Sequence, residues 1–256
     1  MFSNSSKFVE IEGGWLRANF ATIKNTSELA ISLTNVVNGL GQEYNFCRQI
    51  ADILSRSDNV QDTHLIANIE RSLYPAKITE AGIPNFIVPI RPEWAENLFD
   101  EELAKQNIFG ARKELALRRE VVYYRSVKNS GGLKAPGRIL WYVSQGSKAG
   151  RYYQVQAIRA CSRLEEVVVD TPNSLFRQFR RLGVYAFEDV LKTANNNQQS
   201  KVMAIKFSDT EIFNKPIFFD KIKEVLEKNI TLQSPYKITE EQFYKLYNEG
   251  IFKKRI

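Results

Sequence analysis

Residues 110–183 interleave basic and aromatic side chains, a combination suited to binding a polyanion. Of the 36 Lys and Arg residues in the 256-residue chain this stretch holds 15, whereas of the 29 Asp and Glu residues it holds 5. A positive field confined to one region concentrates polyanions there, and each phosphate that it neutralises releases a condensed counterion. Nucleic acid is therefore the first partner to consider, with a basic face that only serves solubility as the alternative.

Two short β-rich segments inside this stretch each carry an aromatic pair. They are EVVYYRS at 120–126 and RILWYVS at 138–144. Side chains alternate between the two faces of a strand, so one member of each pair is expected to face the core and the other to face outward. An outward ring beside an arginine provides a stacking platform for a nucleic-acid base. The alternative is that all four rings fill the core.

The candidate nucleic-acid contacts fall into two groups. The first is cationic and is expected to meet the phosphate backbone: Arg112, Lys113, Arg118, Arg119, Lys128, Lys134, Arg180 and Arg181. The second is expected to line a base pocket and belongs to the two strands: Tyr124, Arg125, Trp141 and Tyr142, with Glu120 and Ser144 as polar readers. A base stacked on one such ring would gain about 1–3 kcal/mol.

The residues that serve most metal sites and nucleophilic enzymes are scarce. His64 is the single histidine, and no Ser or Cys nucleophile motif accompanies it, so it is better placed as part of a helix than as a general base. Cys47 and Cys161 are far apart in sequence and form no CxxC or Cys/His cluster, which argues against a zinc site and a disulfide framework. We expect no metal, no cofactor and a reducing, cytoplasmic location.

Four acidic residues in the first part of the chain, Asp52, Asp58, Asp62 and Glu70, could suggest a metal-dependent nuclease. Their spacing follows the solvated faces of helices, however, and no catalytic motif frames them. The sequence also has no window near the 18 or so apolar residues of a membrane span, and its first residues lack the pattern of a signal peptide. We therefore expect a soluble protein with no membrane partner.

Residues 1–80 are expected to form a small, mainly helical unit. Apolar and polar residues alternate around Gly13 and Gly14, which predicts a short hairpin. Apolar residues then recur at helical spacing over 27–39, 44–54 and 65–73. This unit is a candidate contact for a protein partner.

From residue 83 onward strands and helices are mixed. The run FIVPI predicts a short buried strand, and Pro92 at a first helical position predicts the start of a helix. A long basic loop makes a hairpin-like connection between 120–126 and 138–144. Further strands are predicted at 152–164, 165–170 and 201–213, a helix from Pro172 to Gly183, and two C-terminal helices at 218–229 and after Thr239.

This order of elements resembles the PUA-like superfamily, most closely its ASCH and EVE branches. The resemblance covers roughly 83–220 and rests on the apolar strand, the helix opened by proline, a G-x-K…E-x-R type signature, and RILWYVS. Gly110 to Lys113 match the first part of the signature. Glu120 with Arg125, or Glu114 with Arg118, match the second. The helix 172–182 followed by the strand KVMAIKFS is similar to the late part of such domains.

The resemblance implies an α+β protein with three parts: the helical unit 1–80, a PUA-like small β-barrel over 83–220, and helices over 221–256 packed on the barrel. It also implies binding of RNA, favoured over DNA, or of a modified nucleobase, in a cleft between the first helix and the barrel. Some ASCH domains resemble hydrolases or ribonucleases instead, in which case Lys113 with Glu120 would be the acid/base pair. A third alternative is a protein-interaction module of a larger assembly.

Overall fold

The computed structural model describes residues 9–11, 14–16, 23–40, 45–56, 62–100, 119–146 and 155–251. The chain divides into two compact units, Met1–Ile83 and Pro84–Ile256, and each is described by itself. In the described ranges, no helix combines the length and the apolar character that crossing a bilayer requires.

The first unit is mainly helical, as the periodicity predicts. Its helices are α1 (Thr26–Leu40), α2 (Asn45–Leu54) and α3 (Thr63–Ser72), and its strands are β1 (Val9–Ile11), β2 (Gly14–Leu16), β3 (Ile23–Asn25) and β4 (Lys77–Thr79). The apolar stripes of the helices meet in one core that includes Leu33, Cys47 and Ile66. Asp62, one of the four acidic residues noted above, caps α3 by accepting the backbone N–H groups of residues 64 and 65.

The second unit is built on a six-stranded sheet with the order β10-β5-β7-β8-β9-β6. The strands are β5 (Asn85–Ile90), β6 (Glu120–Ser126), β7 (Gly137–Val143), β8 (Ala157–Asp170), β9 (Val202–Phe218) and β10 (Tyr236–Ile238). β5 and β7 are parallel, and the other neighbours are antiparallel. Among the described residues the pairing does not join β10 to β6, so the sheet is not closed into a barrel. The α+β class is confirmed.

Two expectations about strand connection are corrected. The segments 120–126 and 138–144 do not form a hairpin, because β6 pairs with β9 while β7 pairs with β5 and β8. The segment 165–170 is not a separate strand either, because it continues β8. The β8–β9 ladder is long and irregular, with register shifts between Cys161 and Arg163 and between Leu164 and Glu166. Such bulges bend a strand without ending it.

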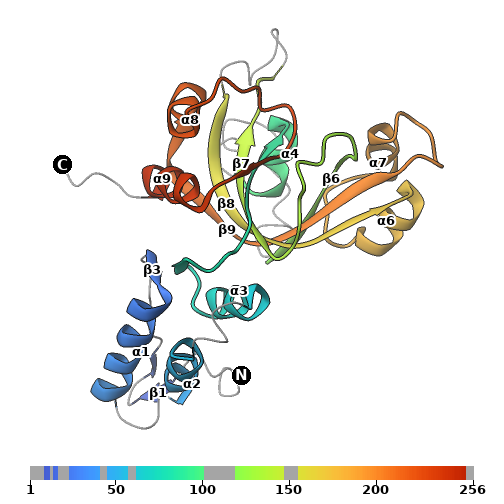
Figure 1. Cartoon of the computed structure of the whole chain (residues 1–256). Coiled ribbons are helices and arrows are strands. Elements are labelled where there is room, and N and C mark those ends of the chain that lie inside the picture. Colours follow the sequence, from blue (N-terminus) through green and yellow to red (C-terminus); the bar gives the residue numbers. More distant parts are fainter. Residues whose placement is uncertain are drawn as a thin grey trace. The chain divides into compact units, whose positions relative to one another are not determined.

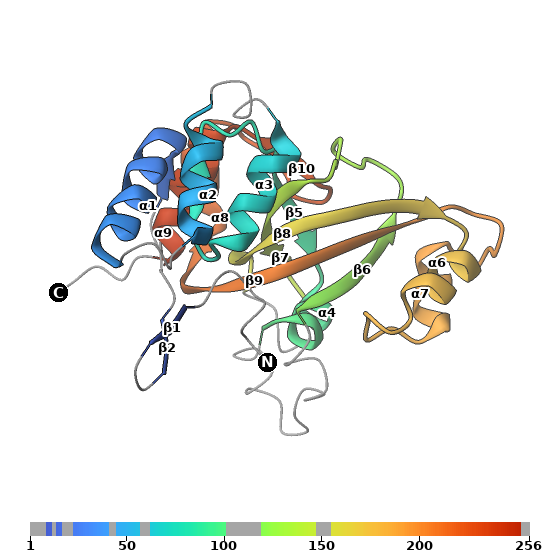
Figure 2. The ribbon, with the colours of Figure 1, turned by 90° about the horizontal axis from the view of Figure 1, so that it is seen from below.

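Five helices accompany this sheet in the described residues: α4 (Pro92–Leu98), α6 (Pro172–Phe179), α7 (Phe187–Thr193), α8 (Phe219–Leu226) and α9 (Glu240–Ile251). Figures 1 and 2 show α6 and α7 together at one end of β8 and β9, with α8 and α9 at the other end. The chain leaves β8 at Asp170 and returns to β9 at Val202, and these two residues are paired in the ladder. The segment that contains α6 and α7 therefore leaves and rejoins the sheet at a single residue pair of the β8–β9 ladder.

Helix α9 is packed closely on the sheet. An added Cβ at Gly250 would lie 2.1 Å from the Phe213 ring of β9, so this position admits no side chain. The guanidinium of Arg138 on β7 is buried and lies over the rings of Phe243 and Tyr244, with its carbon 5.2 and 5.6 Å from the ring centroids. The face of an aromatic ring attracts a guanidinium through a cation–π interaction. This attraction adds to the burial of apolar surface in holding α9 against β7.

Candidate nucleic-acid interface

Trp141, expected to line a base pocket, lies in the core instead. Its side chain is 0% exposed. Its ring centroid is 4.7 Å from that of Phe207 and 5.8 Å from that of Tyr123, and its indole N–H donates to Ser162 Oγ at 2.8 Å. A base could stack on this ring only if the core opened. Trp141 is therefore a structural residue in this arrangement.

Tyr124 and Tyr142 are buried as well. Tyr124 meets the ring of Tyr185 edge-on at 5.0 Å, and Tyr142 lies 5.8 Å from the ring of Phe219. Burial raises the pKa of the Tyr142 hydroxyl to about 12. The prediction of one inward and one outward ring assumes that one face of the sheet is solvated. Here both faces are covered, so alternation does not bring a ring to the surface.

Arg125 and Ser144 complete the expected base pocket, and both are partly buried. The Nε–H of Arg125 donates to the carbonyl of Ser126 at 3.3 Å, and burial lowers the pKa of its guanidinium. The hydroxyl of Ser144 donates to the carbonyl of Ile90 at 3.2 Å, which fastens the end of β7 to β5. These two side chains serve the local backbone here.

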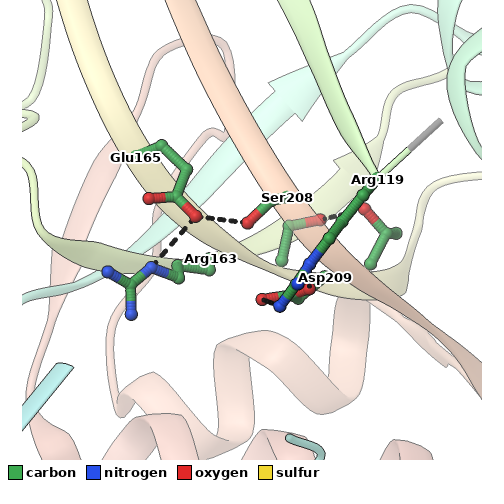
Figure 3. Close-up of polar contacts among 7 residues, drawn as sticks. Arg119, Arg163, Glu165, Ser208 and Asp209 are labelled. Atoms are coloured by element: carbon green, nitrogen blue, oxygen red, sulfur yellow. Dashed lines mark hydrogen bonds and ion pairs between the residues drawn. The ribbon is translucent and has the colours of Figure 1, made fainter. Parts of the chain in front are cut away.

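A cluster of polar side chains lies where β8 and β9 are irregular, and we call it the polar seam. Its members are Arg119, Ser162, Arg163, Glu165, Ser208, Asp209 and Thr210. Figure 3 shows Arg163 and Ser208 directed toward Glu165: Arg163 Nε lies 3.1 Å from Glu165 Oε1, and the Ser208 hydroxyl donates to the same oxygen. The hydroxyls of Ser162 and Thr210 are 2.8 Å apart.

Arg119 was an expected phosphate contact, but the seam engages it. Its Nε and Nη2 donate to the two carboxylate oxygens of Asp209 at 2.7 and 3.3 Å, and this hydrogen bonding raises the pKa of the Arg119 guanidinium. Asp209 has a φ of 51°, a left-handed conformation that Asp tolerates better than most residues. Glu120, expected as a polar reader or an acid/base group, lies 2.9 Å from Lys206 Nζ. Both residues thus have partners of opposite charge.

Three expected cations, Arg112, Lys113 and Arg118, lie outside the described residues, and so does the expected G-x-K sequence. Lys128 and Lys134 are exposed on the loop between β6 and β7. In the described part of the chain, no three His, Cys, Asp or Glu side chains gather as a metal site would require.

Arg180 lines a hollow between α6 and α7 whose volume is about 420 Å³, and we call it the α6–α7 hollow. The residues around it are aromatic, cationic or polar: Asn173, Ser174, Phe176, Arg177, Arg180 and Phe187. The rings of Phe176 and Phe187 are 5.6 Å apart and inclined by 62°. Arg177 and Arg180 are exposed, as is the neighbouring Arg181, and no ion pair of these three with another described residue is present.

An ion pair, two hydrogen bonds and a close backbone approach lie at the base of α6, beneath the hollow. Asp170 accepts hydrogen bonds from Ser174, from Lys201 Nζ at 2.9 Å and from the Thr171 N–H at 2.8 Å, which keep the pKa of its carboxyl well below the usual range. After α6, Gly183 approaches β6 so closely that an added Cβ would lie 3.0 Å from Val122. The helix that carries the cations of the rim is therefore tethered at both of its ends.

Sequence reasoning identifies Arg180 and Arg181 but not Phe176, Arg177 or Phe187. One signal was available, because residues three apart on a helix lie on the same face and Arg177 precedes Arg180 by three. Phe187 carries no such signal, because it comes from the next helix and reaches the hollow through tertiary packing.

No protein-family model matches the chain, and no curated protein matches it. Solved structures with a similar fold include the three described next, and the alignment covers nearly the whole length of each. ASCH from Zymomonas mobilis has 17% identity and a TM-score of 0.46, covering 64% of this chain and 94% of that one.

The other two likenesses are weaker. The N-terminal domain of Staphylothermus marinus McrB has 11% identity and a TM-score of 0.42, covering 65% of this chain and 94% of that one. Human THYN1 protein in complex with 5-methylcytosine containing DNA has 12% identity and a TM-score of 0.39, covering 66% of this chain and 99% of that one. These identities concern the fold alone, so the assignment of function rests on the side chains of this chain.

Proposed function

We propose that the unit Pro84–Ile256 binds nucleic acid through the arginines of α6, with RNA favoured over DNA. One observation carries the proposal: Arg177, Arg180 and Arg181 are exposed, without an ion pair in the described residues, beside a hollow walled by aromatic rings. A guanidinium that has no carboxylate partner can meet phosphate without first breaking an ion pair. Its planar fork also matches phosphate oxygens in a bidentate way.

The preference for RNA rests on what an open aromatic hollow can receive. Folded RNA exposes unpaired nucleotides in loops and bulges, whose bases are free to stack on aromatic side chains. A continuous DNA duplex keeps its bases stacked. The exposed Lys128 and Lys134 are further candidate phosphate contacts of the same unit.

Salt dependence tests the electrostatic part. We expect labelled 20-nucleotide RNA to bind, in fluorescence anisotropy, with an affinity that falls as salt rises, because counterions are released. The double variant Arg177→Ala/Arg180→Ala should weaken binding about tenfold or more at low salt, the equivalent of about 1.4 kcal/mol. It should also flatten the plot of log K against log salt by about 1.4, since each single-strand phosphate contact contributes about 0.7.

The control is Lys245→Ala, which removes a positive charge that is already paired with Glu241 on α9. Its affinity and salt slope should stay at wild-type values. An affinity that does not depend on salt, or an equal loss in both variants, would contradict the proposal. Failure to bind any nucleic acid at low salt, with proteins co-purifying through residues 1–80, would favour a protein-interaction module.

The polymer is tested in parallel arms: the RNA, a DNA of matching sequence, and a duplex containing 5-methylcytosine, the kind of DNA present in the human THYN1 structure. RNA should bind most tightly. A higher affinity for the duplex that depends on its methyl group would indicate that the ligand is a modified base. If the RNA is cleaved in the same samples and Lys113→Ala or Glu120→Ala abolishes the cleavage, the protein is an enzyme and not only a binding protein.

A further inference from the structure

We propose that the α6–α7 hollow receives one unstacked nucleotide, with its base on the aromatic wall and an adjoining phosphate on Arg177 and Arg180. The inference rests on the proposed function, which it deepens by naming single-stranded nucleic acid as the ligand class. The inference adds recognition of a base to the binding of phosphate, because the arginines alone would bind any polyanion.

The size of the hollow fits one such group. Its volume of about 420 Å³ lies within the range of about 300–1,000 Å³ in which small ligands are bound. A base inside a duplex has both of its faces covered by neighbouring bases. It could reach a wall in this hollow only after leaving the stack, which costs a few kcal/mol. A single strand offers the same base without that cost.

The wall has the shape that a flat ring requires. Phe176 and Phe187 are inclined by 62°, so their rings form a corner rather than a slot. A base laid on the face of one ring would meet the other with its edge, which is the favoured relation between aromatic groups. Both phenylalanines are partly buried, so they are held in place while part of each ring stays accessible.

The cations and the polar groups surround this corner. Phe176, Arg177 and Arg180 belong to the same short helix and its C-terminal end, so α6 supplies part of the wall together with the charges at its rim. Asn173 is exposed on the same helix and lines the hollow, where its amide offers both a donor and an acceptor to the edge of a base. Ser174 is engaged by Asp170, so it supports the hollow.

A comparison of two single strands of equal length and charge tests the inference. One carries bases, and the other carries abasic sites in a ribose-phosphate backbone. The protein should bind the strand with bases about 5- to 150-fold more tightly, which is the range for one stacked base. Phe176→Leu and Phe187→Leu, which keep apolar volume but remove the aromatic face, should erase this difference and leave the abasic affinity unchanged.

The abasic strand guards against a folding defect in the leucine variants, because a misfolded α6 would weaken the binding of both strands. If the preference for bases persists in leucine variants that keep the abasic affinity, or if a duplex binds as tightly as the single strand, the inference is overturned. Equal binding of both strands would overturn it while leaving the proposed function intact, whereas failure of both strands to bind at low salt would overturn the two together.

Discussion

The polar seam and the α6–α7 hollow both carry arginines, but only the seam neutralises them. In the seam, Arg119 is matched by Asp209 and Arg163 by Glu165, and the carboxylate side chains are 8% and 11% exposed. At the hollow, Arg177 and Arg180 are exposed and have no ion pair among the described residues. An arginine that is paired with a nearly buried carboxylate supports the fold, whereas an arginine that is exposed and unpaired is available to a ligand. A count of basic residues does not distinguish these two kinds of arginine.

The largest effect should come from breaking the seam. Glu165→Ala removes the shared partner of Arg163 and Ser208, and Ser208 is 0% exposed, so water cannot replace the lost hydrogen bond without entry into the protein. Arg163 and Glu165 are partly buried, and the loss of a partner that leaves a buried polar group such as the Ser208 hydroxyl unsatisfied costs about 1–3 kcal/mol. We expect the free energy of unfolding, measured by urea denaturation, to fall by about this amount.

Glu188→Ala is the control for this prediction, because it removes an exposed carboxylate from α7. It should change the unfolding free energy by no more than about 0.5 kcal/mol. Nucleic-acid affinity of the folded Glu165→Ala protein should equal that of the wild type. A reduced affinity with unchanged stability would instead give the seam a ligand-binding role.

The hollow can be made to resemble the seam by supplying a carboxylate. Asn173→Glu places an acidic side chain four residues before Arg177 on α6, where the two side chains can pair. RNA affinity should fall several-fold, because the arginine is now engaged and the rim is less positive. Stability should rise by about 0.3–0.5 kcal/mol. Anisotropy and urea denaturation of the same preparation measure the two changes.

Asn173→Gln has the same length as the glutamate variant without its charge, so it should lose less RNA affinity than Asn173→Glu. Equal losses in the two variants would mean that shape, not charge pairing, distinguishes the hollow.

The smallest effect concerns Asp170 at the base of the hollow. Hydrogen bonds from Ser174 and Lys201 hold its pKa in the folded protein below the usual value of about 3.9. Its carboxylate therefore contributes stability above about pH 4, and that contribution is lost as pH falls through the folded pKa. The difference in unfolding free energy between wild type and Asp170→Asn should be present at pH 7 and shrink toward pH 3. A difference that stays constant with pH would contradict this account.

Much of the local structure could be predicted, because local signals determine it. Helical spacing predicts a helix at 27–39, and the structure has it at Thr26–Leu40. Pro92 and Pro172 each stand at the start of a helix, as their fixed φ favours. By contrast, the direction of Trp141 could not be predicted, because it depends on what covers each face of the sheet.

The candidate site was only partly predictable for the same reason. Arg180 and Arg181 were found because they are adjacent and basic. The sequence did not show that Arg119, unlike these two arginines, is paired with a carboxylate, because its partner Asp209 is 90 residues away in the sequence. The aromatic wall needs Phe176 and Phe187 from two helices, and no short-range pattern reports that two helices converge.

The pairing of Asp170 with Val202 bears on how such a protein can diversify. Because the chain departs and returns at one pair of the ladder, residues 171–201 form a cassette whose two ends join β8 and β9 at that pair, while the backbone N–H of Val122 on β6 donates to its Leu182 carbonyl. A replacement of different length could leave the ladder in register, provided that it supplies apolar groups where Leu175, Phe179 and Tyr185 are now buried. Because the proposed ligand hollow lies within this segment, grafting another helix pair at this position is a direct route to changing its ligand preference.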